Sequence, residues 1–237
     1  VDNEDSLKQL IGFYRTKTDW PFLSVTRKRI EQSFTDKSDP KVVLDWFASH
    51  PPLTTKGQKT YLKFLIHNHT DKNIIAGMIK EIWQDGNFSE TEERYFQQKY
   101  GQYLSEDDYY NRIDNLIWQK QYSEARKLSR HLNSDRAHLV NARLAYLEDK
   151  TGKELLLKLV PRRYLDNEGL LYSIMLRSSE NDDHQLFNKY FSKIKTIQDM
   201  NYVDRWCGLV NMEIRNLLED SNYDEAYHLS LRARDFN

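Results

Sequence analysis

Few residues in this chain have the types and spacing that catalysis or metal binding requires. His67 and His69 stand two residues apart, so they cannot share a helix face, and they follow the apolar run 61–66. Such a pair is typical of a helix C-terminus, with a metal site as the minor alternative. Cys207 lies in the apolar stretch 206–210 with no histidine near it. It is predicted to be a buried small hydrophobe rather than a nucleophile.

Neighbouring carboxylates are the next candidates for chemistry. They occur as pairs at Glu92–Glu93, Asp107–Asp108 and Asp182–Asp183. Each pair opens or flanks an expected helix, where the helix dipole favours negative charge, so structural or solvated roles are predicted. A glycosidase would need two carboxyl groups that converge on a sugar from separate elements, and spacing in sequence does not show this.

The remaining motifs are weak. Arg162, Arg163 and Tyr164 follow Pro161 and form either part of a groove for sugar or peptide or a solvated helix junction, and the junction is favoured. The chain has no phosphate-binding glycine loop, no G-x-S-x-G motif and no H-E-x-x-H motif. The sequence therefore assigns no catalytic residue, no cofactor-binding residue and no metal ligand.

Composition excludes several classes of function. The 237 residues carry 35 Lys and Arg against 36 Asp and Glu, which gives no overall attraction to nucleic acid or to an anionic membrane. The mean hydropathy is −0.82, and no apolar run approaches the roughly 18 residues of a membrane span. A single cysteine rules out an internal disulfide and a cysteine-based zinc site.

Helix signals run through the whole sequence. Only 8 Gly and 5 Pro interrupt it, and no segment alternates polar and apolar residues as a strand would. Ser89 with Glu92, and Ser105 with Asp108, have capping-box spacing. Pro40 follows Asp39 as the expected first residue of another helix. The fold class is predicted to be all-α.

A loose repeat of helix, polar turn and helix suggests how these helices are organised. The aromatic residues Phe88, Tyr122 and Tyr223 each follow a short polar turn, and Tyr122 comes 34 residues after Phe88. A period near 34 residues is that of paired-helix solenoids. The sequence thus predicts one irregular α-solenoid, or superhelix of stacked helix hairpins, over 1–237. Residues 1–70 would be atypical starting turns, and 71–237 the helix-pair repeats.

Three small or aromatic residues are expected at helix contacts in this architecture. Ala125 and Ala226 occupy the same place after their turn aromatics, and Trp118 ends a face formed by Ile113, Leu116 and Ile117. All three of Trp118, Ala125 and Ala226 are predicted to be buried where helices approach closely.

The block 104–126 resembles the superhelical domain of soluble lytic murein transglycosylases. That domain has leucine, Thr or Ser and an acidic pair, then Arg-x-Asp-x-Leu-Leu-Trp, then Ala-Arg, which here match Leu104–Asp108, Arg112–Trp118 and Ala125–Arg126. The likeness covers nearly the whole chain, with Trp20–Leu23 and 43–53 upstream. Downstream it includes Asn141–Arg143, Val160–Pro161, Asp204–Trp206 and 225–229. Two positions depart from the pattern: Tyr109 stands in place of His, and Glu168 in place of the Pro of Pro-Gly-Leu.

The resemblance implies a non-catalytic part of a cell-wall lyase. In that family a lysozyme-like domain cleaves peptidoglycan glycan strands to 1,6-anhydro products with the Glu of a Glu-Ser dipeptide, and these 237 residues contain no such dipeptide. The implied role is a scaffold that helps admit glycan strands, and the implied location is the periplasm, with which a start at Val1 rather than Met is compatible. Peptidoglycan would be the partner, bound weakly or through the missing catalytic domain. The alternative is a free-standing helical-repeat module that binds a protein.

Overall fold

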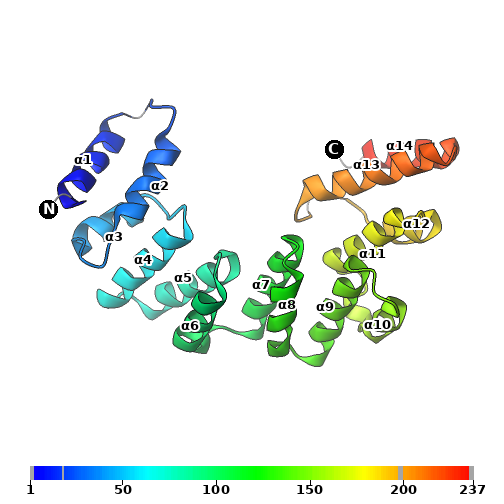
Figure 1. Cartoon of the computed structure of the whole chain (residues 1–237), viewed down its shortest axis with the longest axis horizontal. Coiled ribbons are helices and arrows are strands. Elements are labelled where there is room, and N and C mark those ends of the chain that lie inside the picture. Colours follow the sequence, from blue (N-terminus) through cyan, green and yellow to red (C-terminus); the bar gives the residue numbers. More distant parts are fainter. Residues whose placement is uncertain (1–2, 18, 197–199, 235–237) are drawn as a thin grey trace. The chain divides into compact units, whose positions relative to one another are not determined.

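The computed structural model describes residues 3–17, 19–196 and 200–234. The described residues form fourteen α-helices and three short 3-10 helices with no strand (Figure 1), which confirms the all-α prediction. The helices group into two compact units, 1–112 and 113–237, and each is described by itself.

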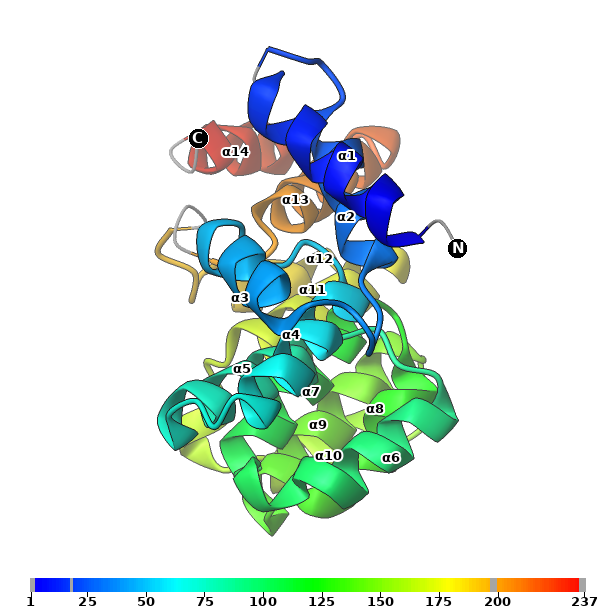
Figure 2. The same ribbon diagram turned by 90° about the vertical axis from the view of Figure 1, so that its left-hand side faces the viewer.

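Six helices and the beginning of a seventh build the first unit. They are α1 (Asn3–Thr16), α2 (Leu23–Ser33), α3 (Pro40–Ser49), α4 (Thr55–His67), α5 (Lys72–Asp85) and α6 (Glu90–Tyr100), followed by η1 (Gly101–Tyr103) and α7 (Glu106–Trp118). The helices α1 and α2 lie side by side (Figure 2), α4 packs on α2, α3 and α5, and η1 packs on α5 and α6.

Apolar side chains that recur with the helical period form the core of the first unit. Helix α3 begins at Pro40, capped by the Asp39 carboxylate, which accepts the Lys41 N–H at 2.8 Å, as the sequence predicts. Its buried residues are Val43, Trp46 and Phe47. The cluster around it consists of Leu7, Ile11, Ile30, Phe34, Val43, Trp46, Phe47 and Phe64.

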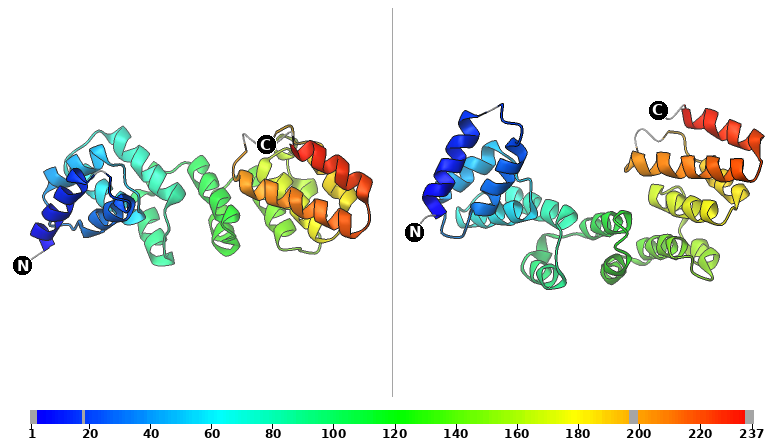
Figure 3. Two further views of the ribbon diagram at one scale, coloured as in Figure 1. Left: turned by 90° about the horizontal axis from the view of Figure 1, so that it is seen from above. Right: turned by 45° about the horizontal axis from the view of Figure 1, so that its top comes forward.

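The second unit contains the end of α7 and seven further α-helices. They are α8 (Tyr122–Leu128), α9 (Ser134–Leu147), α10 (Lys153–Leu159), α11 (Glu168–Glu180), α12 (His184–Phe191), α13 (Val203–Glu219) and α14 (Tyr223–Arg234), with η2 (Ser129–His131) and η3 (Arg162–Tyr164) between them. Packing follows chain order: α9 contacts α8, α10 and α11, α11 contacts α12 and α13, and α13 and α14 lie side by side (Figure 3). Stacking of these hairpins into a solenoid stays a prediction.

Predicted burial in the second unit is confirmed. Trp118 and Ala226 are each 3% exposed and Ala125 is fully buried. Trp118 and Ala226 belong to one cluster, formed by Trp118, Leu171, Met175, Phe187, Phe191, Ile194, Trp206, Leu209, Val210, Leu217, Ala226 and Leu229. The small side chains at 125 and 226 thus lie in the interior, where a larger group would have no room.

Five helices end in the same left-handed turn, and none of them uses glycine. In each, the residue after the C-cap has φ between 51° and 63°. Its N–H bonds to the carbonyl three residues back, and the next N–H bonds to the carbonyl five residues back, at 2.8–3.4 Å, which is the Schellman pattern. The left-handed residues are His69, Lys120, Asp149, Asp182 and Ser221. They end α4, α7, α9, α11 and α13, and another helix follows each of them within a few residues.

The turn after α5 differs from the two with which the sequence pairs it. Helix α5 ends at a Gly86 C-cap with φ −68°, so it has no left-handed residue. Phe88 does not open α6, because Ser89 is the N-cap and the helix begins at Glu90. The predicted capping box of Ser89 and Glu92 is formed, with the Ser89 N–H bonded to the Glu92 carboxylate at 2.9 Å.

Candidate functional site

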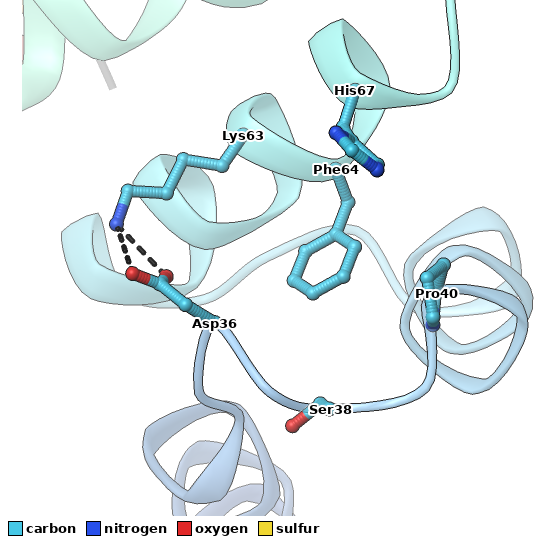
Figure 4. Close-up of a pocket in the computed structure, with 6 residues that line it drawn as sticks. All are labelled: Asp36, Ser38, Pro40, Lys63, Phe64 and His67. Carbon is cyan, nitrogen blue, oxygen red and sulfur yellow. Dashed lines mark hydrogen bonds and ion pairs between the residues drawn. The ribbon is translucent and has the colours of Figure 1, made fainter.

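The described part of the first unit has several surface hollows, of which three are lined by side chains that could bind a ligand. One, of about 360 Å³, is drawn in Figure 4 and is lined by Asp36, Ser38, Pro40, Lys63, Phe64 and His67. In Figure 4 the Lys63 ammonium reaches across to Asp36, with Nζ 2.9 Å from Oδ1, and His67 lies next to the Phe64 side chain. Both members of the ion pair are more than half exposed, so the pair contributes little stability.

The second hollow follows the same helix, α4, and holds three lysines that all have partners. It measures about 670 Å³ and includes Lys56, Lys59 and Lys63. Lys56 donates to the Gln32 carbonyl and Lys59 to the Glu92 carboxylate, both at 2.7 Å. The Lys59 hydrogen bond, helped by Ser89, lowers the pKa of Glu92 to about 2. Lys59 and Lys63 thus pair with carboxylates, whereas Lys56 donates to a neutral carbonyl.

The third hollow contains two lysines, Lys72 and Lys99, that form no ion pair among the described residues. We call it the Lys72–Lys99 pocket. It measures about 540 Å³ and is lined by Ile66, His69, Thr70, Asp71, Lys72, Ile75, Ile79, Lys99, Tyr100, Gln102 and Tyr103. Among the described residues neither Lys72 nor Lys99 pairs with a carboxylate. The pocket takes its walls from the left-handed turn after α4, the first turns of α5, the end of α6, and η1.

Two buried arginines connect helices that are distant in sequence. Arg112 of α7 donates from Nη1 to the Trp83 carbonyl at 2.7 Å and the Gly86 carbonyl at 3.0 Å. It thereby satisfies the carbonyls at the end of α5, which lacks the left-handed turn of its neighbours. Its Nη2 also pairs with Glu93 at 2.8 Å, while only 4% of the Arg112 side chain is exposed.

The second buried arginine lies between three helices. Arg143 of α9 is 1% exposed and forms an ion pair with Asp114 of α7. Its guanidinium covers Gly169 of α11, where a Cβ would come within 2.6 Å of Nε. Next to Gly169, burial raises the pKa of Glu168, although its hydrogen bond from Trp206 Nε1, at 3.3 Å, opposes the shift. The absence of a side chain at 169 therefore creates the space that the guanidinium fills.

His184 bridges two carboxylates at the start of α12. Its Nδ1 lies 2.7 Å from Glu213 Oε1 and its Nε2 lies 3.0 Å from Asp220 Oδ2. Glu213 is fully buried. Burial alone would lower the pKa of His184, but the hydrogen bonds to Asp220 and Glu213 outweigh it, so the pKa lies above 6.5. Only the imidazolium form donates from both ring nitrogens, so this geometry is that of a charged histidine.

The histidine pair and the cysteine of the sequence analysis lie apart. His67 is the last residue of α4, and His69 is the left-handed residue just beyond it, so this pair does end a helix. The prediction that Cys207 is buried is wrong, because this side chain is only partly covered. The buried face of α13 runs through Trp206, Val210 and Glu213, and position 207 lies about 100° around the helix from 206.

The acidic pairs and the Arg-Tyr segment have structural partners. Asp108 forms the predicted capping box, with the Ser105 N–H at 2.7 Å from its carboxylate. Asp183 caps α12 by accepting the Leu186 N–H at 3.0 Å. Arg163 pairs with Asp135 at 2.7 Å, and both side chains are well exposed, which fits a solvated helix junction.

Comparison with known proteins gives no relative. No protein family, no curated protein and no solved structure matches the chain. Among the residues that the structure describes, no three His, Cys, Asp or Glu side chains are grouped so that they could hold a metal ion. Within the same residues, every helix is too short or too polar to cross a membrane.

Proposed function

We propose that this chain is a non-catalytic, superhelical scaffold of a periplasmic lytic transglycosylase and helps to position peptidoglycan glycan strands for cleavage by a separate catalytic domain. The proposal begins with the resemblance of the sequence to that domain. It includes the stacking of the helix hairpins, the periplasmic location and peptidoglycan as the partner.

The observation that carries the proposal is the meeting of three resemblance motifs in one buried contact. Asp114 belongs to the Arg-x-Asp motif, Arg143 to Asn-Ala-Arg, and Gly169 to the Gly-Leu pair. The three positions span 55 residues, yet Arg143 pairs with Asp114 and covers Gly169. These three residues of the resemblance motifs contact one another in the structure. Their contact supports a shared architecture more strongly than three matches in sequence alone would.

The second buried arginine supports the same proposal. Arg112 opens the Arg-x-Asp motif, and its hydrogen bonds go to the turn that ends α5. The motif therefore combines two structural tasks within three residues of α7. Neither task is catalytic, which agrees with a scaffold.

Intact murein sacculi provide the test. The purified chain is incubated with sacculi, the bound fraction is measured by co-sedimentation, and the soluble products are analysed by mass spectrometry. We expect saturable binding without release of 1,6-anhydro-muropeptides. Release that is lost on substitution of an acid within these residues would refute the non-catalytic assignment, and the absence of binding would refute the positioning role.

Exposed apolar side chains favour the alternative, a helical-repeat module that binds a protein. Leu155 and Leu159 lie one turn apart on α10 and are 65% and 53% exposed. Such a surface suits a hydrophobic partner helix. If this alternative is right, the double variant Leu155→Ser and Leu159→Ser would no longer bind the partner protein. Its binding to sacculi would equal that of the unmodified chain.

A further inference from the structure

We propose that the Lys72–Lys99 pocket binds a short peptide with free carboxylates, and that its ligand is the peptide stem of peptidoglycan. This inference rests on the proposed function, to which it adds a site and a class of ligand. It places recognition of the peptide part of the polymer on the first unit.

Uncompensated positive charge is the first argument. Lys72 is exposed at the first position of α5 and forms no ion pair among the described residues. Lys99 Nζ bonds to the Tyr95 hydroxyl at 3.3 Å and lies 5.2 Å from the centre of the Tyr100 ring. The Tyr95 hydrogen bond raises the pKa of Lys99, so this group stays charged at neutral pH.

One acid in the pocket lining offsets only part of this charge. Asp71 lines the pocket, but it is the N-cap of α5 and accepts the Asn73 N–H at 2.7 Å. The pocket lining therefore carries the two positive charges of Lys72 and Lys99 against the one negative charge of Asp71. The other two hollows differ, since Lys59 pairs with Glu92 and Lys63 pairs with Asp36.

The apolar lining of this pocket distinguishes it from a site that would bind a simple anion. Ile79 is fully buried, Ile75 is 9% exposed and Ile66 is 37% exposed, and all three line the cavity. Inorganic phosphate would gain nothing from isoleucine, whereas the methyl groups of alanine residues would. A cavity of about 540 Å³ lies in the range of sites that enclose small ligands.

Together these features match the chemistry of a peptidoglycan stem. Such a stem combines alanine methyl groups with the carboxylates of acidic residues within four or five residues. Carboxylates would pair with Lys72 and Lys99, and the methyl groups would contact Ile66 and Ile75. The polar rim formed by Gln102 and Thr70 offers hydrogen bonds to the peptide backbone.

Isothermal titration calorimetry of the whole chain with a purified stem tetrapeptide tests the inference. We expect saturable binding that weakens as salt is added. Lys72→Gln and Lys99→Gln should each weaken binding roughly two- to fivefold, and the double variant about tenfold, since exposed ion pairs contribute little each. Lys28→Gln is the matched control, because Lys28 is exposed on α2 outside the pocket, and it should leave the affinity unchanged.

Two further ligands and one spectrum locate the site. The same tetrapeptide with its carboxylates amidated should not bind, and an all-L acidic peptide of equal charge shows whether the pocket prefers stems to protein segments. In ¹⁵N spectra the amide shifts should concentrate at 69–72 and 99–103. Circular dichroism confirms that the lysine variants are folded.

The outcomes separate this inference from the proposed function. Binding to sacculi without any heat from the tetrapeptide would overturn the inference and leave the scaffold role intact. Equal affinity of the wild type and the double lysine variant, or shifts confined to other residues, would also overturn it. Tighter binding of the all-L peptide would show that the pocket serves a protein partner instead.

Discussion

Substitution of Gly169 by alanine tests the buried arginine contact most directly. The new Cβ would lie 2.6 Å from Arg143 Nε, whereas ordinary contacts begin at 3.4 Å. Arg143 is 1% exposed and paired with Asp114, so a shift of its guanidinium would disturb this buried ion pair. Overpacking of this kind costs about 1–3 kcal/mol, and loss of the ion pair would add to it. We expect a net loss of about 2–3 kcal/mol, or a fall in Tm of roughly 4–12 °C.

The matched control is a glycine in the same unit with open space around it. Gly208 lies in the middle of α13, and nothing stands within 4 Å of a Cβ placed there. Gly208→Ala should therefore stabilise the protein by about 0.5–1 kcal/mol through helix propensity. Urea unfolding followed by circular dichroism measures both variants, which are expected to shift the midpoint in opposite directions.

A double-mutant cycle decides whether the cost arises from the contact. In an Arg143→Met background, Gly169→Ala should cost less than about 0.5 kcal/mol, since the guanidinium is gone. A Gly169→Ala protein as stable as the wild type would refute the reasoning. The same cost in both backgrounds would show that Arg143 is not its source.

Variants at three other positions examine the second unit. Ala125→Leu should cost about 1–3 kcal/mol by overpacking a fully buried position, and an unchanged urea midpoint would contradict this. Lys120→Gly should stabilise by roughly 0.5 kcal/mol, because relief of a left-handed backbone exceeds the added freedom of the unfolded chain, and Lys120→Val should destabilise. The raised pKa of His184 contributes stability that is full below pH 6.5 and is lost as pH rises through the folded value. Thermal unfolding from pH 6 to 9 should show this loss, and His184→Gln, which cannot carry the charge between Glu213 and Asp220, should flatten it.

Signals within a few residues predicted structure well. The capping boxes at Ser89 and Ser105 form where their spacing indicates, because both partners lie within one helical turn. The prediction for Cys207 failed because it depends on distant residues. An apolar stretch predicts that a helix forms, but which face of the helix is buried depends on the helices that pack against it.

The Lys72–Lys99 pocket could not be predicted in this way. Its two lysines are 27 residues apart on different helices, and the turn at His69 and the packing of η1 on α5 bring their neighbours together. The lack of carboxylate partners could not be predicted either, because the chain has nearly equal numbers of acidic and basic residues, 36 and 35. The capping pattern after α4 was the available signal, and it identified His69 as the end of a helix without indicating the hollow next to it.

The five left-handed turns have a consequence for how this chain could change over evolutionary time. Because backbone hydrogen bonds hold these turns, His69, Lys120, Asp149, Asp182 and Ser221 occupy the same conformation with unrelated side chains. The residues at these turns can therefore vary among polar types while the turn is kept, whereas any side chain at position 169 would meet the Arg143 guanidinium. Homologous hairpins would share hydrogen-bond patterns long after their corner residues ceased to match.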